Sequence, residues 1–312
     1  MSAFHPDLTR ARFIPAIPAG PRFARFAQRL PIRPKAAPAD MLVENVTVPG
    51  PPDAPSVRLR VYRPRSAAGP TPALFWLHGG GYILGSPEQD EARSIAMARE
   101  LGITVVAAAY RLAPDHPSPS AVEDAHAGLR WLFANADARG VDPARIAIGG
   151  ASAGGGLAAA LALVAHDRGE VRPAFQLLLY PMLDDRTVLR TDVDVRHLRL
   201  WSAKNNRFGW SAYLGRPPGG ADVSPYAAPA RREDLSGLPP AWIGVGTLDL
   251  FHDEDVAYAA RLNAAGVPSE LYVVPGAFHG FDIAFRRANV SQDFWRQQTR
   301  VLRGALGLPA AP

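Results

Sequence analysis

The segment from Ile146 to Gly156, with the sequence IAIGGASAGGG, restricts the possible folds of this chain more than any other. An apolar, strand-like run leads directly into Gly-x-Ser-x-Gly around Ser152, and an alanine-rich stretch typical of a helix follows. Small residues on both sides of a serine are typical of a nucleophile elbow, a tight turn that raises the hydroxyl above a sheet. The same pentapeptide occurs by chance in roughly one chain in ten, and a glycine-rich packing turn would also contain it. Further motifs are needed to decide between these two interpretations.

Apolar runs alternate with helix-like segments along much of the chain. Two runs separated by Pro49-Gly-Pro-Pro predict an antiparallel strand pair at a sheet edge. The later strands, most of them followed by a helix, predict a mostly parallel, doubly wound, eight-stranded sheet of the α/β class. The predicted strands are 41–48, 56–63, 73–78, 103–110, 145–149, 175–180, 241–245 and 270–274, and the predicted helices are 88–101, 120–135, 155–166, 253–265 and 292–306.

Two segments do not fit this alternation. Residues 1–40 contain two helix-like pieces, at 5–13 and 21–30, that prolines interrupt. Residues 185–235 contain polar, helix-like sequence with several aromatic side chains, and they are too long for a plain connection. We interpret both segments as parts of one helical cap over the carboxyl ends of the strands, and surface decoration is the alternative. The main α/β domain would then consist of residues 41–184 and 236–312.

A serine hydroxyl becomes a nucleophile only beside an imidazole base that a carboxylate orients. In proteins with this elbow, the acid and then the histidine follow the serine along the chain. His279 lies in a loop after the last predicted strand, and Asp249 follows the strand before it. Because the carboxyl ends of parallel strands meet at one edge of a sheet, we predict that Ser152, Asp249 and His279 form a catalytic triad.

Other carboxylates lie close to Asp249 in the sequence. Asp253, Glu254 and Asp255 suit the first turn of a helix, where the helix dipole favours negative charge. A metal site formed by His252, Asp253 and Asp255 is the alternative, but their adjacent spacing does not place three ligands on one helical face. We therefore expect no metal site.

The motif His78-Gly-Gly-Gly81 follows another buried strand. Three glycines allow the backbone to approach a substrate closely and to point N–H groups at a developing negative charge. The N–H of Ala153, which follows the elbow serine, is expected to complete this oxyanion hole. A flexible turn is the alternative interpretation of this motif. The motif precedes the elbow, and both follow apolar strands, which favours an oxyanion hole.

These motifs occur together with others in a fixed order. The others are Tyr110-Arg-Leu-Ala-Pro-Asp-His-Pro117 with Ala121-Val-Glu-Asp124, Asp249 ahead of Asp253-Glu254, and Phe278-His-Gly-Phe281. Over residues 40–307 the chain resembles the bacterial hormone-sensitive-lipase-like (family IV) carboxylesterases of the α/β-hydrolase superfamily. The resemblance implies an α/β-hydrolase fold with a helical cap and the triad named above. It also implies that Gly80, Gly81 and Ala153 are the oxyanion donors, with Gly79 in the same motif.

The chain departs from the family pattern at two places. Ala151 stands before the nucleophile, where the family usually has an acid, and Leu250-Phe251 follow the triad acid, where the family usually has proline and leucine. Neither change removes a catalytic group. We read Arg111, Asp115 and Glu123-Asp124 as buried polar anchors of a loop near the site.

Five aromatic residues are candidates for the substrate pocket. Tyr82 directly follows the glycine motif, and the other four lie in the predicted cap. Core packing is an equally good explanation for any one of them. The candidates are Tyr82, Trp201, Phe208, Trp210 and Tyr213.

The resemblance implies a serine carboxylesterase that hydrolyses short- to medium-chain esters through an acyl-enzyme, with a small-molecule ester as substrate and no cofactor. A non-catalytic small-molecule-binding protein on the same fold is the alternative from another class. Amidase, lactonase or acyltransferase activity on the same triad stays open. The resemblance also implies a homodimer, and residues 270–306 are the first surface to consider.

Composition excludes several other classes. The net charge is +5, but the cations are scattered arginines apart from Lys35 and Lys204, so we expect no nucleic-acid partner. The absence of cysteine excludes disulfides and thiolate catalysis. No apolar run reaches the roughly 18–20 residues of a membrane span, and the first residues do not resemble a signal peptide. We therefore expect a cytoplasmic protein with no membrane contact.

Overall fold

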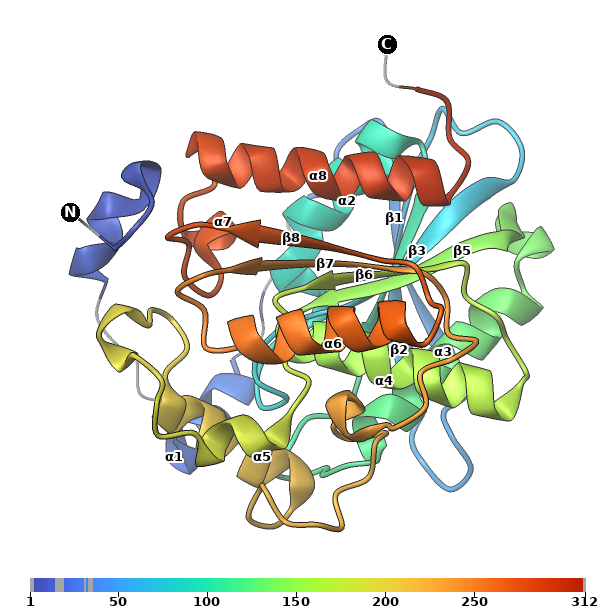
Figure 1. Cartoon of the computed structure of the whole chain (residues 1–312). Coiled ribbons are helices and arrows are strands. Elements are labelled where there is room, and N and C mark those ends of the chain that lie inside the picture. Colours follow the sequence, from blue (N-terminus) through green and yellow to red (C-terminus); the bar gives the residue numbers. More distant parts are fainter. Residues whose placement is uncertain (1–2, 15–19, 31, 33–35, 311–312) are drawn as a thin grey trace.

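Eight strands form one sheet in the computed structural model, which describes residues 3–14, 20–30, 32 and 36–310 (Figure 1). The sheet order is β1-β2-β4-β3-β5-β6-β7-β8. Strand β2 is antiparallel to both β1 and β4, and all other neighbouring strands are parallel, which confirms the predicted sheet. The strands are β1 (Met41–Val48), β2 (Val57–Pro64), β3 (Thr71–Leu77), β4 (Thr104–Ala109), β5 (Val141–Ala151), β6 (Phe175–Leu179), β7 (Ala241–Gly246) and β8 (Ser269–Val274).

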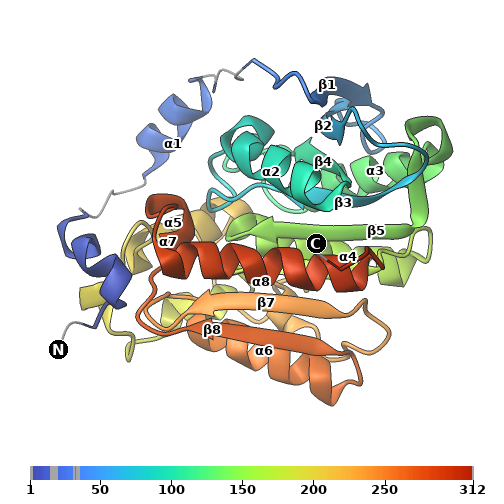
Figure 2. The same ribbon diagram turned by 90° about the horizontal axis from the view of Figure 1, so that it is seen from above.

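Helices cover both faces of the sheet (Figures 1 and 2). One face carries α2 (Glu91–Leu101) and α8 (Asn289–Ala305), and the other carries α3 (Ser120–Ala134), α4 (Ala153–Arg168) and α6 (His252–Ala264). Each face has its own apolar core. No helix among the described residues is long and apolar enough to cross a membrane.

Alternate residues of the central strands contribute to the two cores. Phe75 of β3 and Ile148 of β5 face the core under α3 and α4, whereas Leu74 and Ala147 face the core under α2 and α8. Side chains of a strand point alternately to its two faces, so a strand covered on both faces must be apolar throughout. This burial explains the continuous apolar runs in the sequence.

The remaining helices belong to the N-terminal segment, to the inserted segment or to connections between strands and helices. The N-terminal segment contains the 3₁₀ helix η1 (Pro6–Phe13) and the helix α1 (Pro21–Gln28), and part of the prediction for residues 1–40 lies outside the described residues. Both segments with cap-like sequence lie toward the carboxyl ends of the strands (Figures 1 and 2). The inserted segment, residues 185–235, contains η4 (Asp185–Leu189), η5 (Val195–His197), α5 (Ala203–Leu214) and η6 (Pro229–Arg231); the others are η2 (Pro87–Asp90), η3 (Asp137–Arg139) and α7 (Phe281–Ala284).

Two helices begin at least two residues earlier than the sequence pattern indicates. Helix α4 begins at Ala153 rather than Gly155, because the elbow turn contains only Ser152. Helix α8 begins at Asn289 rather than Gln292. The N–H of Val290, in its first turn, donates to the Asp7 carboxylate at 3.1 Å, so a residue from the other end of the chain stabilises the start of this helix.

Candidate active site

Ser152 occupies the turn between β5 and α4 with φ of +57°, a left-handed conformation that is strained for a residue with a side chain. The flanking glycines leave room for this turn. A β-carbon on Gly150 would lie 2.3 Å from the Gly154 carbonyl oxygen, and one on Gly154 would lie 2.1 Å from the Leu77 carbonyl oxygen. The Gly-x-Ser-x-Gly spacing is therefore a steric requirement of this turn.

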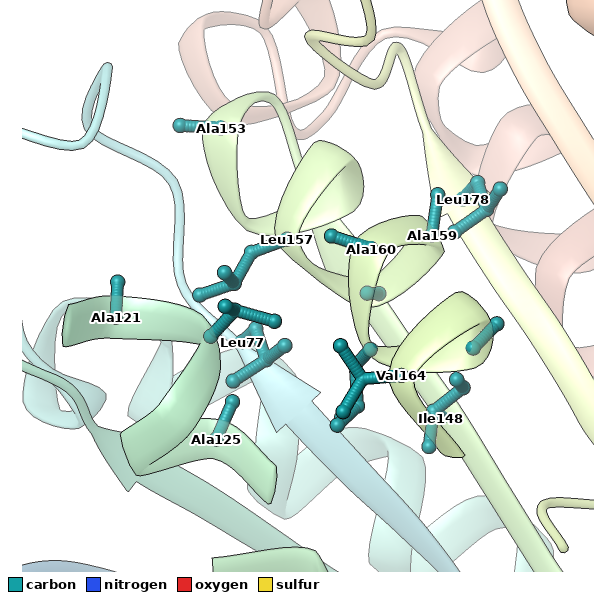
Figure 3. Packing of buried hydrophobic residues seen from close by; sticks show 14 of the residues in the cluster. Leu77, Ala121, Ala125, Ile148, Ala153, Leu157, Ala159, Ala160, Val164 and Leu178 are labelled. Atoms are coloured by element: carbon teal, nitrogen blue, oxygen red, sulfur yellow. The ribbon is translucent and has the colours of Figure 1, made fainter. Parts of the chain in front are cut away.

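Hydrogen bonds and packing hold the strained turn. The Ser152 N–H donates to the Leu179 carbonyl at 2.9 Å, and the Ser152 carbonyl accepts from the N–H groups of Gly156 and Met182 at 3.0 Å each. Helix α4 is buried from Ala153 to Ala165 and packs on β5, β6 and α3, as Figure 3 shows. These contacts determine where the Ser152 hydroxyl lies.

The predicted triad residues come together at the carboxyl edge of the sheet. His279 Nε2 lies 2.9 Å from Ser152 Oγ, and His279 Nδ1 lies 2.8 Å from Asp249 Oδ2. Less than a tenth of each residue is exposed. Because the carboxylate only accepts, Nδ1 carries the proton and Nε2 is free to accept one from the serine hydroxyl.

The turn after β7 fixes the carboxylate of Asp249. Its Oδ1 accepts from the Phe251 N–H at 3.0 Å while its Oδ2 meets His279, so both oxygens have partners. The Phe251 ring also packs edge-on against the imidazole, with the ring centroids 5.2 Å apart. The departure from the family pattern at Leu250-Phe251 therefore preserves the partners of the acid. The departure at Ala151 places a small buried side chain in the core under α2 and α8.

The neighbouring carboxylates have other roles. The Glu254 carboxylate accepts from the Leu183 N–H at 2.7 Å and from the Thr187 hydroxyl, which ties the start of the inserted segment to α6. Burial holds the pKa values of Glu254 and Asp255 well above their ordinary values. In the described residues, neither oxygen of Asp255 has a hydrogen-bond partner.

Sequence reasoning missed the side chains behind His279. The Tyr180 ring lies edge-on to the imidazole at 4.9 Å, and its hydroxyl donates to Asp282 Oδ1 at 2.8 Å. Asp282 forms an ion pair with Arg93, which also donates to Gln298 on α8 at 2.6 Å. Asp282 lies three residues after His279, but only the fold brings Arg93 to it from α2.

The glycine loop after β3 lies against the elbow, since a β-carbon on Gly79 would be 2.9 Å from the Ala151 carbonyl oxygen. In the part of the chain that the structure describes, the N–H groups of Gly80, Gly81 and Ala153 donate to no protein acceptor. These three groups are therefore available to an oxyanion.

The carbonyls of the glycine loop are held by other groups. The Gly79 carbonyl accepts from His78 Nδ1 and from Gln89 Nε2, both at 3.0 Å. The Gly80 carbonyl accepts from the Ile83 and Leu84 N–H groups. In a trans peptide the next N–H points away from the carbonyl, so these bonds orient the N–H groups of Gly80 and Gly81. Burial lowers the pKa of His78, and its neutral ring stacks on Tyr110.

The five candidate pocket aromatics occupy different environments. Tyr82, Trp210 and Tyr213 are buried in the core, where Tyr82 and Tyr213 stack with centroids 3.9 Å apart. Their burial fits the core-packing alternative for these three residues. Phe208 is half-buried. Trp201 packs against the glycine loop, because a β-carbon on Gly81 would lie 2.1 Å from its Cη2.

The predicted polar anchors are only partly buried. Asp124 is buried and accepts from the Arg111 backbone N–H at 2.9 Å and from its guanidinium. Asp115 is not buried: its side chain is 60% exposed and faces Arg25 of α1 at 3.7 Å. The prediction was therefore wrong for Asp115, because a charged loop residue without a buried partner stays in solvent.

The sheet, the elbow and the hydrogen-bonded Ser152, His279 and Asp249 define an α/β hydrolase. A family model described as alpha/beta hydrolase fold matches residues 74–283. The chain is similar to the carboxylic ester hydrolase LipN of Mycobacterium tuberculosis, with 38% identity over 244 residues, which are 77% of this chain and 64% of LipN. It is 36% identical over 242 residues to the carboxylesterase NlhH of the same organism, covering 72% and 71% of the two chains.

A solved structure of a bacterial heroin esterase superposes with a TM-score of 0.88 and 37% identity, covering 97% of this chain and 98% of that one. The chain thus belongs to the hormone-sensitive-lipase-like carboxylesterases of the α/β-hydrolase superfamily, and it is a carboxylic-ester hydrolase.

Proposed function

We propose that Ser152 is the nucleophile of a two-step esterase. Ser152 Oγ attacks the ester carbonyl while His279 Nε2 accepts the hydroxyl proton. The tetrahedral intermediate then collapses, His279 gives this proton to the leaving alcohol, and an acyl-Ser152 ester remains. Water, deprotonated by His279, attacks the acyl-enzyme, and the acid product and free Ser152 form. The observation that carries this proposal is the hydrogen-bonded series Ser152, His279, Asp249, at 2.9 and 2.8 Å.

The N–H groups of Gly80, Gly81 and Ala153 would bind the oxyanion of each tetrahedral intermediate. Their lack of acceptors among the described residues supports this role. Gly79 contributes by its close fit against the elbow. Asp249 would orient His279 and stabilise the imidazolium that forms in each step.

We further propose that residues 1–40 and 185–235 form one cap and that short- to medium-chain esters are the substrates. Arg199 of the inserted segment donates to the Ala11 carbonyl at 2.9 Å and lies over the Phe4 ring, so the two segments are in contact. A cap against the site would limit the size of the ester. Location in the cytoplasm and formation of a homodimer stay predictions.

The test is replacement of the nucleophile. We expect Ser152→Ala to lower kcat/KM for p-nitrophenyl acetate by about four orders of magnitude or more while the melting temperature stays close to that of the wild type. A fluorophosphonate probe should label the wild-type protein at Ser152 and leave Ser152→Ala unlabelled. Activity or labelling that survives in Ser152→Ala would show that another group is the nucleophile.

The same experiment addresses the alternatives. A non-catalytic binding protein would give neither turnover nor covalent labelling. Amidase, lactonase or acyltransferase activity would also depend on Ser152, so comparison of ester, anilide and lactone substrates distinguishes these activities by their relative kcat/KM.

A further inference from the structure

Two consecutive residues of the inserted segment contact the two loops that flank Ser152. A β-carbon on Gly280, the residue after His279, would lie 3.2 Å from Leu200 Cδ1. The Trp201 ring packs directly on Gly81 of the glycine loop. Leu200 therefore lies against the loop of His279, and Trp201 lies against the glycine loop.

The backbone at Leu200 is strained. Its φ is +62°, and the Trp201 N–H donates to the Arg199 carbonyl at 2.7 Å, which is the hydrogen bond of a three-residue γ-turn. A leucine holds a left-handed conformation only where its surroundings determine it. Such strain is common in residues that bind or orient a ligand.

Contacts on both sides of Leu200 keep this turn in place. Trp201 Nε1 donates to Asn206 Oδ1 at 3.3 Å, and a β-carbon on Gly209 would lie 3.2 Å from Trp201 Cζ2. On the other side, Arg199 Nε donates to the Ala11 carbonyl at 2.9 Å. The half-buried Leu200 side chain thus has a fixed position beside the histidine loop.

The chemistry of the proposed mechanism indicates which part of an ester lies next to Leu200. His279 Nε2 must reach the leaving alcohol oxygen to protonate it, so the alcohol group begins on the side of His279 and Gly280. The carbonyl oxygen lies instead at the N–H groups of Gly80 and Gly81. We propose that Leu200 determines the size of the alcohol group that the site accepts. This proposal rests on the proposed esterase function.

The test compares acetate esters of alcohols of increasing size. Every acetate gives the same acetyl-Ser152, so the alcohol affects only the acylation step. We expect Leu200→Ala to raise the ratio of kcat/KM for benzyl acetate to that for ethyl acetate by about tenfold or more, the effect of opening a pocket by a few carbon atoms. The corresponding ratio for p-nitrophenyl butyrate and acetate, which share one leaving group, should change by less than about twofold.

Controls separate this role from a general loosening of the fold. Val195→Ala changes an exposed apolar residue of the same segment and should leave both ratios unchanged. Leu200→Gly removes the side chain but accepts the positive φ, so it tests the proposal if Leu200→Ala folds poorly. The proposal is wrong if both Leu200 variants keep the alcohol ratio within about twofold of wild type, or if the alcohol and acyl ratios change equally. Failure of the esterase proposal is distinguishable, since the wild type would then hydrolyse none of these esters or activity would survive in Ser152→Ala.

Discussion

Asp255 is a buried carboxyl group near Asp249 without a compensating partner among the described residues. It is buried, both of its oxygens lack partners among the described residues, and Glu254 and Asp249 are its charged neighbours. Burial raises its pKa well above the ordinary value near 4, so the folded protein holds a proton there that the unfolded chain releases. The contribution of this group to the free energy of unfolding is therefore complete below about pH 4, and it falls as the pH rises above that value.

Asp255→Asn should remove that dependence, because the amide does not ionise. We expect the variant to gain about 1 kcal/mol or more in free energy of unfolding at about pH 8 and little at about pH 4, measured by urea denaturation. Asp253→Asn is the matched control on the same helix. The hydrogen bond from His252 and the ion pair with Arg190 lower the pKa of Asp253. Loss of the Asp253 carboxylate should therefore reduce the free energy of unfolding at neutral pH. If the free energy of unfolding changed equally with pH in the wild type and in Asp255→Asn, Asp255 would not be the group that holds this proton.

Helix α7 is joined to α2 through one buried ion pair. Asp282 of α7 pairs with Arg93 of α2, and the Tyr180 hydroxyl donates to the same carboxylate. Removal of one partner from a buried pair leaves the other charge without compensation, which costs far more than loss of an exposed pair. The loop that carries His279 leads directly into α7, so this ion pair also supports the position of His279.

Asp282→Asn should therefore lower the free energy of unfolding by about 3 kcal/mol. The exposed pair between Arg300 of α8 and Glu270 of β8 is the control, and Glu270→Gln should cost less than about 1 kcal/mol. Urea denaturation of both variants measures the difference. Similar losses in the two variants would mean that the Asp282 pair contributes no more to stability than a surface pair.

The N-terminal 3₁₀ helix η1 and the inserted segment touch each other across nearly two hundred residues of sequence. Arg199 lies over the Phe4 ring and donates to the Ala11 carbonyl, and His197 packs edge-on against Phe4. These contacts join η1 to the inserted segment. If the two segments form one cap, loss of the contacts should loosen both together.

Arg199→Met tests this coupling. We expect faster backbone hydrogen exchange, measured by mass spectrometry, in residues 4–13 and 195–199 and unchanged protection in the central strands. Arg196→Met is the control, since the Arg196 guanidinium pairs with Asp194 of the same turn. Faster exchange in the inserted segment alone would indicate that the N-terminal segment does not depend on it.

Much of this protein follows from the sequence because the determining interactions are local. Continuous apolar runs predict the central strands, since a strand covered on both faces must be apolar. The glycines around Ser152 predict the elbow, because a β-carbon on Gly150 or Gly154 would overlap the backbone. The positions of Asp249 and His279 after neighbouring strands place them at one edge, since parallel strands end together.

Contacts between distant parts of the chain were decided only by the tertiary structure. The start of α8 depends on Asp7, the support of His279 depends on Arg93, and the position of Leu200 depends on Gly280 and Ala11. Such pairs leave no periodic pattern, because each partner looks like an ordinary polar or apolar residue in its own segment. The sequence by itself thus determined the fold and the residues predicted to react. The tertiary structure decided which groups lie against them and which side chain lies beside the loop of His279, because those contacts form only when the sheet brings the segments together.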